Sequence, residues 1–198
     1  MAAYIRHFFG IGIPAACVFA CFAPYRMRAL RAQRLHSCFL REATLYLFVA
    51  YLFGLAALVL WPQYILLQGN LVILNARKSF TDGVNWVPFY MIRGYIQALE
   101  EGNLYYGLVY FAGNIAAFMP LGFLLPLLFR NQGPIRVFLI GLGYSLTAEY
   151  LQFFLGRHCD VDDVMLNALG SILGYLSFRL FKWLFPVFAE YFRCRKSK

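Results

Sequence analysis

The sequence predicts an all-α integral membrane protein with about five transmembrane helices and an amphipathic interfacial helix in an outer loop. Hydrophobic residues make up 62% of the 198 residues and charged residues only 14%, with a mean hydropathy of +0.62. A soluble domain usually carries about 25% charged residues. Aromatic residues reach 19%, which suits a chain that meets lipid and its interfaces. These values exclude an ordinary soluble globular domain.

The expected membrane helices follow from runs of apolar residues. A helix needs roughly 20 mainly apolar residues to cross the hydrocarbon core. Windows of this kind occur at 4–23, 44–67, 104–129, 135–155 and 164–187. The first can also be interpreted as a cleavable signal peptide, because small residues lie near its end. A cluster of arginines follows it directly and resists translocation, so we interpret this window as a membrane anchor.

Basic residues predict the orientation of the chain, because Lys and Arg concentrate in cytoplasmic segments. The segments that we place in the cytoplasm (24–41, 130–136 and the tail from 193) hold eleven of them. The connections that we place outside (68–103 and 156–163) hold four. The N-terminus is then outside and the C-terminus cytoplasmic. This asymmetry accounts for the net charge of +9, so we expect no nucleic-acid partner.

The outer connection at 68–103 is too long to be a simple turn. Pro88 marks a first helical turn, and apolar residues then repeat at helical spacing: Ile92, Tyr95, Ile96 and Leu99. This pattern predicts an amphipathic helix that either braces the bundle or recognises lipid headgroups. We therefore expect three regions: a two-helix membrane region with a basic loop (1–67), the outer loop (68–103), and a three-helix core with a basic tail (104–198).

Polar side chains gather toward the outer ends of the last three predicted helices. A charged residue inside a membrane costs roughly 2.5–3.5 kcal/mol on insertion scales and by default indicates function. Glu149 is the clearest case, about 9 Å below the outer end of its helix at the usual helical rise. Ser145 and Gln152 share its helix face. Asn114 lies about 15 Å below the outer start of the preceding helix.

The last predicted helix carries a matching stripe of polar and small residues. Asp163, Asn167, Gly170 and Gly174 follow one another at intervals of four, three and four. The step from Gly170 to Gly174 permits close contact between helices. Because polar faces at matched depth can hydrogen-bond to each other, we expect the three helices to meet along these faces.

The segment before this helix is acidic and allows two interpretations. Asp160, Asp162 and Asp163 follow Arg157 and His158. In the structural interpretation, Asp160 or Asp162 caps the helix, all three aspartates favour its positive end, and Arg157 pairs with one of them. In the functional interpretation, the same groups belong to a site that includes Glu149.

Three chemistries suit such a site. Neighbouring carboxylates, one of them desolvated, can perform acid–base hydrolysis or transfer, and the catalytic candidates are Glu149, Asp160 and Asp163. The aspartates and His158 offer ligands to a divalent cation, but their spacing fits no specific metal loop, and we predict no metal and no other cofactor. A buried glutamate can also relay protons or hold the polar end of a ligand. The ligand-binding candidates are Asn114, Ser145, Gln152, Arg157, Asp162 and Asn167.

Several of these residues belong to motifs whose order and spacing are characteristic of one family. The motifs are Asn85-Trp86-Val87-Pro88-Phe89, then Gly113-Asn114-Ile115 with Phe118-Met119-Pro120-Leu121-Gly122-Phe123, then Glu149-Tyr150-Leu151-Gln152, and finally Arg157 and Asp160-Val161-Asp162-Asp163 with Asn167, Gly170 and Gly174. Over about residues 85–176 the chain resembles the VanZ-like family. The departures are His158-Cys159 and Thr147-Ala148, which leave the polar positions unchanged.

The resemblance implies a multi-pass protein of the bacterial cytoplasmic membrane that lowers susceptibility to teicoplanin-type lipoglycopeptides. It implies a phenotype more firmly than a reaction. Our first hypothesis is a protein that binds an amphiphile at the outer leaflet, either the antibiotic's lipid tail or a lipid-linked wall precursor. The alternative is an intramembrane hydrolase or transferase that acts on a lipid or lipopeptide through Glu149 and Asp160 or Asp163. A proton-coupled carrier would need inverted repeats that the sequence lacks, and a scaffold would tolerate Glu149→Gln. We expect membrane lipids as partners, and the sequence predicts no oligomeric state.

Overall fold

The computed structural model describes residues 2–60, 64–67, 70–73, 84–155, 158–193 and 195–196. Helices make up most of this part of the chain: α1 (Ala2–Cys21), α2 (Ala23–Ala32), α3 (Phe39–Leu60), α4 (Tyr90–Glu100), α5 (Leu104–Leu128), α6 (Pro134–Phe154), α7 (Val161–Leu184) and α8 (Pro186–Tyr191). Short strands pair two by two: β1 (Leu35–His36) with β6 (Arg195–Lys196), β2 (Tyr64–Leu67) with β3 (Asn70–Ile73), and β4 (Val84–Asn85) with β5 (Cys159–Asp160). The first two pairs are antiparallel and the third is parallel.

The all-α membrane fold is confirmed. Each of α3, α5, α6 and α7 is long and apolar enough to cross a membrane. Helices α1 and α2 meet the same criterion only together, as a span bent by 49° between them. The first predicted window is therefore part of a broken helix, and α2 occupies sequence that we expected to be a cytoplasmic loop. The protein is a multi-pass membrane protein whose described residues hold four helices that could cross a membrane, or five spans if the bent pair of α1 and α2 counts as one.

The second predicted window, 44–67, is wrong at both ends. Helix α3 begins five residues earlier, at Phe39, and its last helical residue is Leu60. Residues Tyr64–Leu67 instead form β2, which pairs with β3. A proline at position 62 disfavours a continuing helix. A short apolar run cannot be assigned to helix or strand by periodicity alone, which explains the error.

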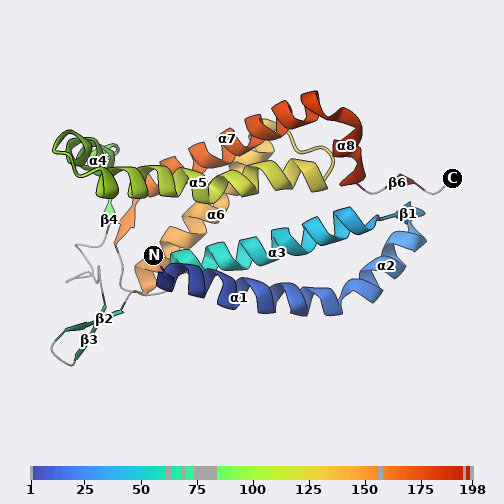
Figure 1. Cartoon of the computed structure of the whole chain (residues 1–198), viewed down its shortest axis with the longest axis horizontal. Coiled ribbons are helices and arrows are strands. Elements are labelled where there is room, and N and C mark those ends of the chain that lie inside the picture. Colours follow the sequence, from blue (N-terminus) through green and yellow to red (C-terminus); the bar gives the residue numbers. More distant parts are fainter. Residues whose placement is uncertain are drawn as a thin grey trace.

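The two ends of the bundle have different elements (Figure 1). Helix α4, the β4–β5 pair and the N-terminus lie at one end, here called the α4 end. Helices α2 and α8 and the β1–β6 pair lie at the other, here called the α8 end. The three basic segments that we predicted to be cytoplasmic therefore share one end of the molecule. That this end faces the cytoplasm remains a prediction.

Helices α5 and α7 pack closely along the predicted glycine stripe. A Cβ atom at Gly170 would collide with the carbonyl oxygen of Ile115, and one at Gly174 would collide with that of Met119. Gly122 on α5 makes the reciprocal approach to the carbonyl oxygen of Ser171. Small residues at these positions let the two backbones touch, as is common between membrane helices. The close contact expected from Gly170 and Gly174 is confirmed.

Candidate functional site

Glu149 is buried at the α4 end of α6, with only 4% of its surface exposed. Its carboxylate accepts a hydrogen bond of 2.9 Å from the backbone N–H of Asp160. The side chain of Cys159 also hydrogen-bonds to it. We expected Arg157 or a shared proton as its partner, and Arg157 lies outside the described residues. The observed N–H donor belongs to β5, which leads directly into α7, so Glu149 joins α6 to the start of α7.

Asp160 caps α7, as one of the two structural alternatives predicted. Its side chain accepts from the backbone N–H of Asp162 at 2.9 Å. The side-chain amide of Asn85 also donates to both of its carboxylate oxygens, each at 3.2 Å. Burial raises the pKa of the Asp160 carboxyl, while these two hydrogen bonds act in the opposite direction. Asp160 thus ties β4, which holds Asn85, to the first turn of α7.

Asp162 attaches α4 to α7. Its side chain is fully buried and accepts from the backbone N–H groups of Phe89 (2.6 Å), Met91 (2.8 Å) and Ile92 (3.1 Å). These donors lie in the residue before α4 and in its first turn, where N–H groups have no partner within the helix. The cap also corrects the predicted start: α4 begins at Tyr90, and Phe89 before it has a left-handed backbone with φ 65°. Pro88 therefore precedes the helix and lies outside its first turn.

The remaining polar candidates form pairs between helices, at the matched depths that we expected. Asn114 on α5 donates to Asp163 on α7 at 2.7 Å. Asn167 on α7 donates to the hydroxyl of Ser145 on α6 at 2.9 Å. The side-chain oxygen of Asn167 is buried and has no partner within the described part of the chain. Gln152 is buried on the same face of α6 as Glu149, as predicted. The structure thus brings together every described candidate from the sequence.

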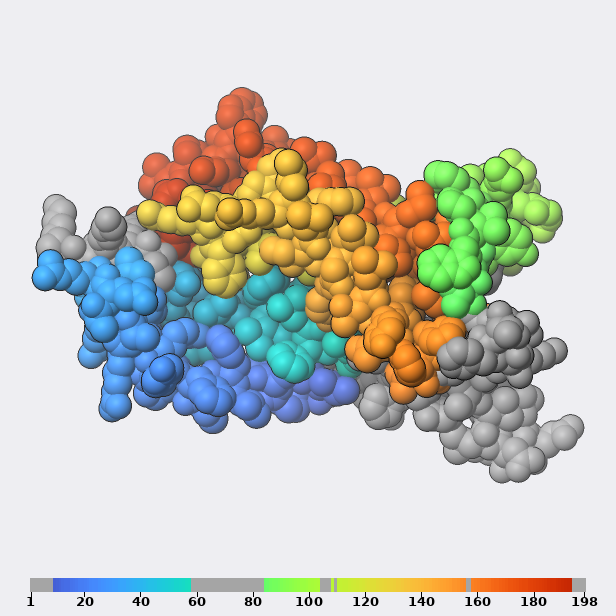
Figure 2. Space-filling view, turned by 180° about the vertical axis from the view of Figure 1, so that it is seen from behind, coloured from blue at the N-terminus to red at the C-terminus, as the bar shows by residue number. Residues whose placement is uncertain are grey.

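An apolar groove of about 480 Å³ opens beside Glu149. Its lining residues come from β4, α6, β5 and α7 and from the residue after β4: Val84, Asn85, Trp86, Leu146, Glu149, Tyr150, Phe153, Phe154, Cys159, Val161 and Val164. We call this space the Glu149 groove. In the view from behind, the segment 84–100 (green) lies against the end of α6 and the start of α7 (orange) (Figure 2). The volume lies within the range of about 300–1,000 Å³ that is usual for small-molecule sites.

Sequence reasoning missed the apolar wall of this groove. Leu146, Tyr150 and Phe153 follow one another at intervals of four and three residues, so they form a stripe on α6 beside Glu149. Exposed aromatic residues on a membrane helix are common, and this stripe carried no separate signal. The short parallel pairing of β4 with β5 brings Trp86 to the groove, and no sequence pattern predicted that pairing.

The chemistry of the groove limits its reactions. Burial, followed by the neighbouring charge of Glu149, raises the pKa of the Cys159 thiol to about 12, so this thiol is protonated at neutral pH and is a poor nucleophile. Within the described residues, no three His, Cys, Asp or Glu side chains lie close enough together to hold a metal ion. Glu149 is the only carboxylate among the residues that line this apolar groove in the described part of the chain.

The fold and the groove define a multi-pass helical membrane protein with a polar network at one end. The VanZ/LLP1 family model matches residues 48–182, and the chain therefore belongs to the VanZ-like family. Protein VanZ of Enterococcus faecium is 30% identical over 126 residues, which cover 61% of this chain and 69% of that protein. No solved structure matches the chain. The family match extends further toward the N-terminus than the motifs at 85–176 and includes most of α3.

Proposed function

We propose that this protein lowers the susceptibility of a bacterial cell to teicoplanin-type lipoglycopeptides by binding an amphiphile in the Glu149 groove. The amphiphile is either the lipid tail of the antibiotic or a lipid-linked cell-wall precursor. The α4 end then faces outward, so the N-terminus is outside and the C-terminus is cytoplasmic. Membership of the VanZ-like family supports the phenotype. The groove, with one carboxylate in an otherwise almost apolar lining, is the observation that supports the mechanism.

The lining of the groove suits an acyl or polyprenyl chain. Phe153, Phe154 and Val164 offer apolar surface, and each buried CH₂ of a lipid chain contributes about 0.8 kcal/mol. Trp86 and Tyr150 are 77% and 63% exposed, and such aromatic side chains are favoured where lipid meets water. A chain would lie among these residues while its polar head remains at the interface.

The polar network would supply the rest of the site. Glu149 lines the groove and would bind a donor group on the amphiphile, such as a hydroxyl or an amine. Asp160 and Asp162 are engaged with backbone donors, so they would position β4, which lines the groove, and the start of α4 relative to α7. The pairs Asn114–Asp163 and Ser145–Asn167 lie between the helices and would keep α5, α6 and α7 in register.

The proposal is tested by growth inhibition of a sensitive Gram-positive host that expresses the protein at matched membrane levels. Wild type should protect against teicoplanin more than against vancomycin, because vancomycin lacks the lipid tail. Leu146→Trp fills the groove and should abolish protection. Leu139→Trp, seven residues earlier on α6 and outside the groove, is the matched control and should retain it. Equal protection by both variants would contradict the proposal.

Glu149→Gln tests the polar end of the site, with Glu100→Gln on the exposed face of α4 as its control. Loss of both protection and ligand binding in Glu149→Gln supports a binding role for the carboxylate. Loss of protection with binding retained would instead favour the intramembrane acid–base enzyme, in which Glu149 acts as the general base. Full protection by Glu149→Gln would leave the network with a structural role only.

A further inference from the structure

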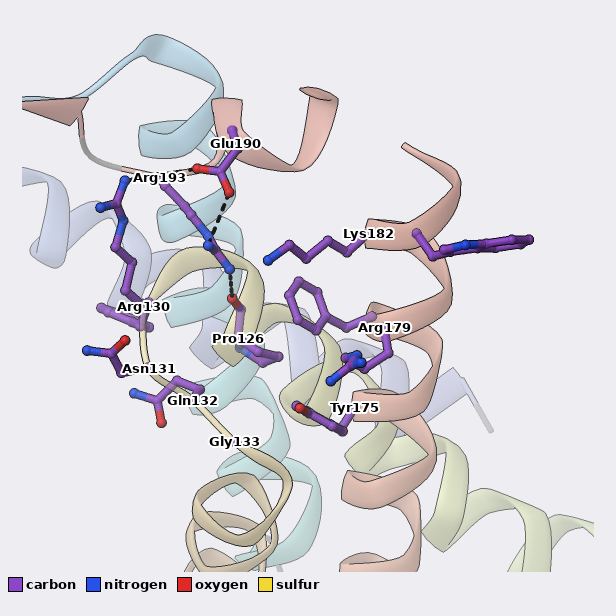
Figure 3. A pocket seen from close by; sticks show the side chains of 13 residues that line it. Pro126, Arg130, Asn131, Gln132, Gly133, Tyr175, Arg179, Lys182, Glu190 and Arg193 are labelled. Atoms are coloured by element: carbon purple, nitrogen blue, oxygen red, sulfur yellow. Dashed lines mark hydrogen bonds and ion pairs between the residues drawn. The ribbon is translucent and has the colours of Figure 1, made fainter. Parts of the chain in front are cut away.

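A second pocket lies at the α8 end, far from the Glu149 groove along the bundle. It has a volume of about 940 Å³ and lies between the α5–α6 turn, the last turns of α7, and α8. Its basic lining comes from three places in the chain: Arg130 in the turn, Arg179 and Lys182 on α7, and Arg193 after α8. With Glu190, the pocket holds four basic side chains and one carboxylate, a formal net charge of +3. We call it the basic pocket (Figure 3).

One cation of the basic pocket is fixed in place by the protein. Arg193 is 14% exposed, pairs with Glu190 at 3.2 Å and donates to the carbonyl oxygen of Pro126 at 3.2 Å. That carbonyl belongs to the last turn of α5, where carbonyl groups lack helical partners. Glu190 also lies 4.0 Å from Arg130. The single carboxylate is thus already shared by two arginines.

The two cations of α7 have no such partner. No carboxylate within the described residues lies in salt-bridge distance of Arg179 or Lys182 (the four ion pairs involve other residues). Figure 3 shows Lys182 reaching from α7 into the pocket toward Arg193. Uncompensated cations that converge on one space lower the free energy of an anion placed there, and a phosphate can accept several N–H donors at once.

The walls of the pocket also include surface that would meet lipid. Trp183, in the last turn of α7, is 76% exposed, and Phe129 at the end of α5 is 37% exposed. Aromatic side chains of this kind concentrate at the two interfaces of a bilayer. Basic pockets between membrane helices at the cytoplasmic side are typical sites for anionic lipid headgroups. The pocket therefore combines a phosphate-binding charge with an interfacial aromatic rim.

We propose that the basic pocket binds the phosphate of an anionic membrane lipid, with Arg179, Lys182 and Arg193 as its donors. The acyl chains then lie along Trp183 and Phe129. A buried side-chain oxygen of Gln132, which also lines the pocket, has no donor within the described residues and can accept from a headgroup hydroxyl. Phosphatidylglycerol offers both the phosphate and such hydroxyls, so it is the probe of choice. This site does not depend on the function proposed for the Glu149 groove.

The test uses Trp183 as a local reporter in the full chain. Trp61→Phe and Trp86→Phe leave it as the sole tryptophan of the sequence. The protein is reconstituted in nanodiscs, and quenching of Trp183 by brominated phosphatidylglycerol is compared with quenching by brominated phosphatidylcholine. Arg179→Gln with Lys182→Gln removes two cations of the pocket. Arg28→Gln with Arg31→Gln removes two exposed cations of α2 at the same end and is the matched control.

In the wild type, brominated phosphatidylglycerol should quench Trp183 more strongly than brominated phosphatidylcholine. We call the ratio of the two the lipid preference, and it should fall about five-fold or more in the pocket variant. The α2 variant should keep most of the preference. An equal fall in both variants would show diffuse attraction to the basic end and overturn the site. Loss of the preference on addition of millimolar inorganic phosphate would show that the pocket binds a soluble anion, and would contradict the proposal that its ligand is a lipid. Lys182→Gln alone repeats the test in a milder variant, and far-UV circular dichroism confirms that each variant is folded.

Discussion

The two ends of the bundle differ in the sign of their charged side chains and in how these are held. At the α4 end, carboxylates are buried and held by backbone N–H groups and amides, as Asp162 is by three N–H groups. At the α8 end, three arginines and one lysine line an open pocket with one shared carboxylate, Glu190, which is 43% exposed. Removal of a buried carboxylate with fixed donors lowers the free energy of unfolding strongly, because its donors would be left unsatisfied. An exposed ion pair contributes little. The α4 end is thus built to hold one geometry, and the α8 end to attract anions.

The largest effect on stability is expected where a carboxylate is removed from the α4 end. Asp162→Ala should lower the free energy of unfolding by roughly 3–5 kcal/mol, because three backbone N–H donors at the start of α4 lose the fully buried carboxylate that accepts from them. Glu190→Ala, the counterpart at the α8 end, should cost at most about 1 kcal/mol. Unfolding in mixed micelles with increasing SDS, followed by circular dichroism, measures both. Similar losses in the two variants would remove the contrast between the ends.

The second effect concerns the helix contact that supports the α4 end. Gly170→Ala should destabilise the protein by about 1–3 kcal/mol, because the added Cβ would collide with the carbonyl oxygen of Ile115. Gly143→Ala on α6 meets open space and is the control, expected to be neutral or to gain up to about 1 kcal/mol. The same SDS titration applies. If Gly170→Ala is as stable as Gly143→Ala, α5 and α7 do not touch as described.

A smaller effect is expected for the hydrogen bond between Asn114 and Asp163. A double-mutant cycle with Asn114→Leu and Asp163→Leu should give a coupling of about 0.6 kcal/mol, the usual mean between membrane helices, and at most about 1.7 kcal/mol. Unfolding of the wild type, both single variants and the double variant supplies the four free energies. A coupling near zero would mean that the two side chains are not paired in the membrane.

The smallest effect concerns the pH dependence of Cys159 alkylation, which involves no change in the stability of the protein. The Cys159 thiol has a pKa raised to about 12, so its thiolate fraction should keep rising about ten-fold per pH unit between pH 7 and 10. Cysteines with an ordinary thiol level off near their pKa of about 8.5. Alkylation rates followed by mass spectrometry compare Cys159 with a free model thiol such as N-acetylcysteine. A plateau for Cys159 near pH 9 would show that this thiol is neither desolvated nor close to Glu149.

Hydropathy was enough to predict the membrane class and the approximate helices 104–129, 135–155 and 164–187, because long apolar runs have few alternative structures. Helical spacing also predicted the shared face of Glu149 and Gln152 and the glycine contact of α7. These features depend on residues that are near each other in sequence or on a single helix face. They are therefore visible without the fold.

Two of the features that sequence reasoning missed depend on partners far apart in the chain. Asp162 caps α4, more than 70 residues earlier, and a single aspartate gives no signal of which helix it will cap. The groove needs the parallel pairing of β4 with β5, each two residues long. The strand at 64–67 looked like the end of a helix because its four residues are apolar. Contacts between distant segments decided the first two cases, whereas β2 pairs with the next strand, β3.

Equilibrium binding of amphiphiles to the purified protein in nanodiscs tests most directly whether the Glu149 groove is a binding site. A teicoplanin-type lipoglycopeptide and a polyprenyl-linked wall precursor are each titrated beside their lipid-free counterparts. At least one lipid-bearing ligand should bind about ten-fold or more tightly than its counterpart, since burial of two or three CH₂ groups suffices for this difference. Leu146→Trp should abolish that preference, and Leu139→Trp should preserve it. No preference for either lipid-bearing ligand, or one that Leu146→Trp leaves intact, would contradict the assignment of the Glu149 groove as the binding site.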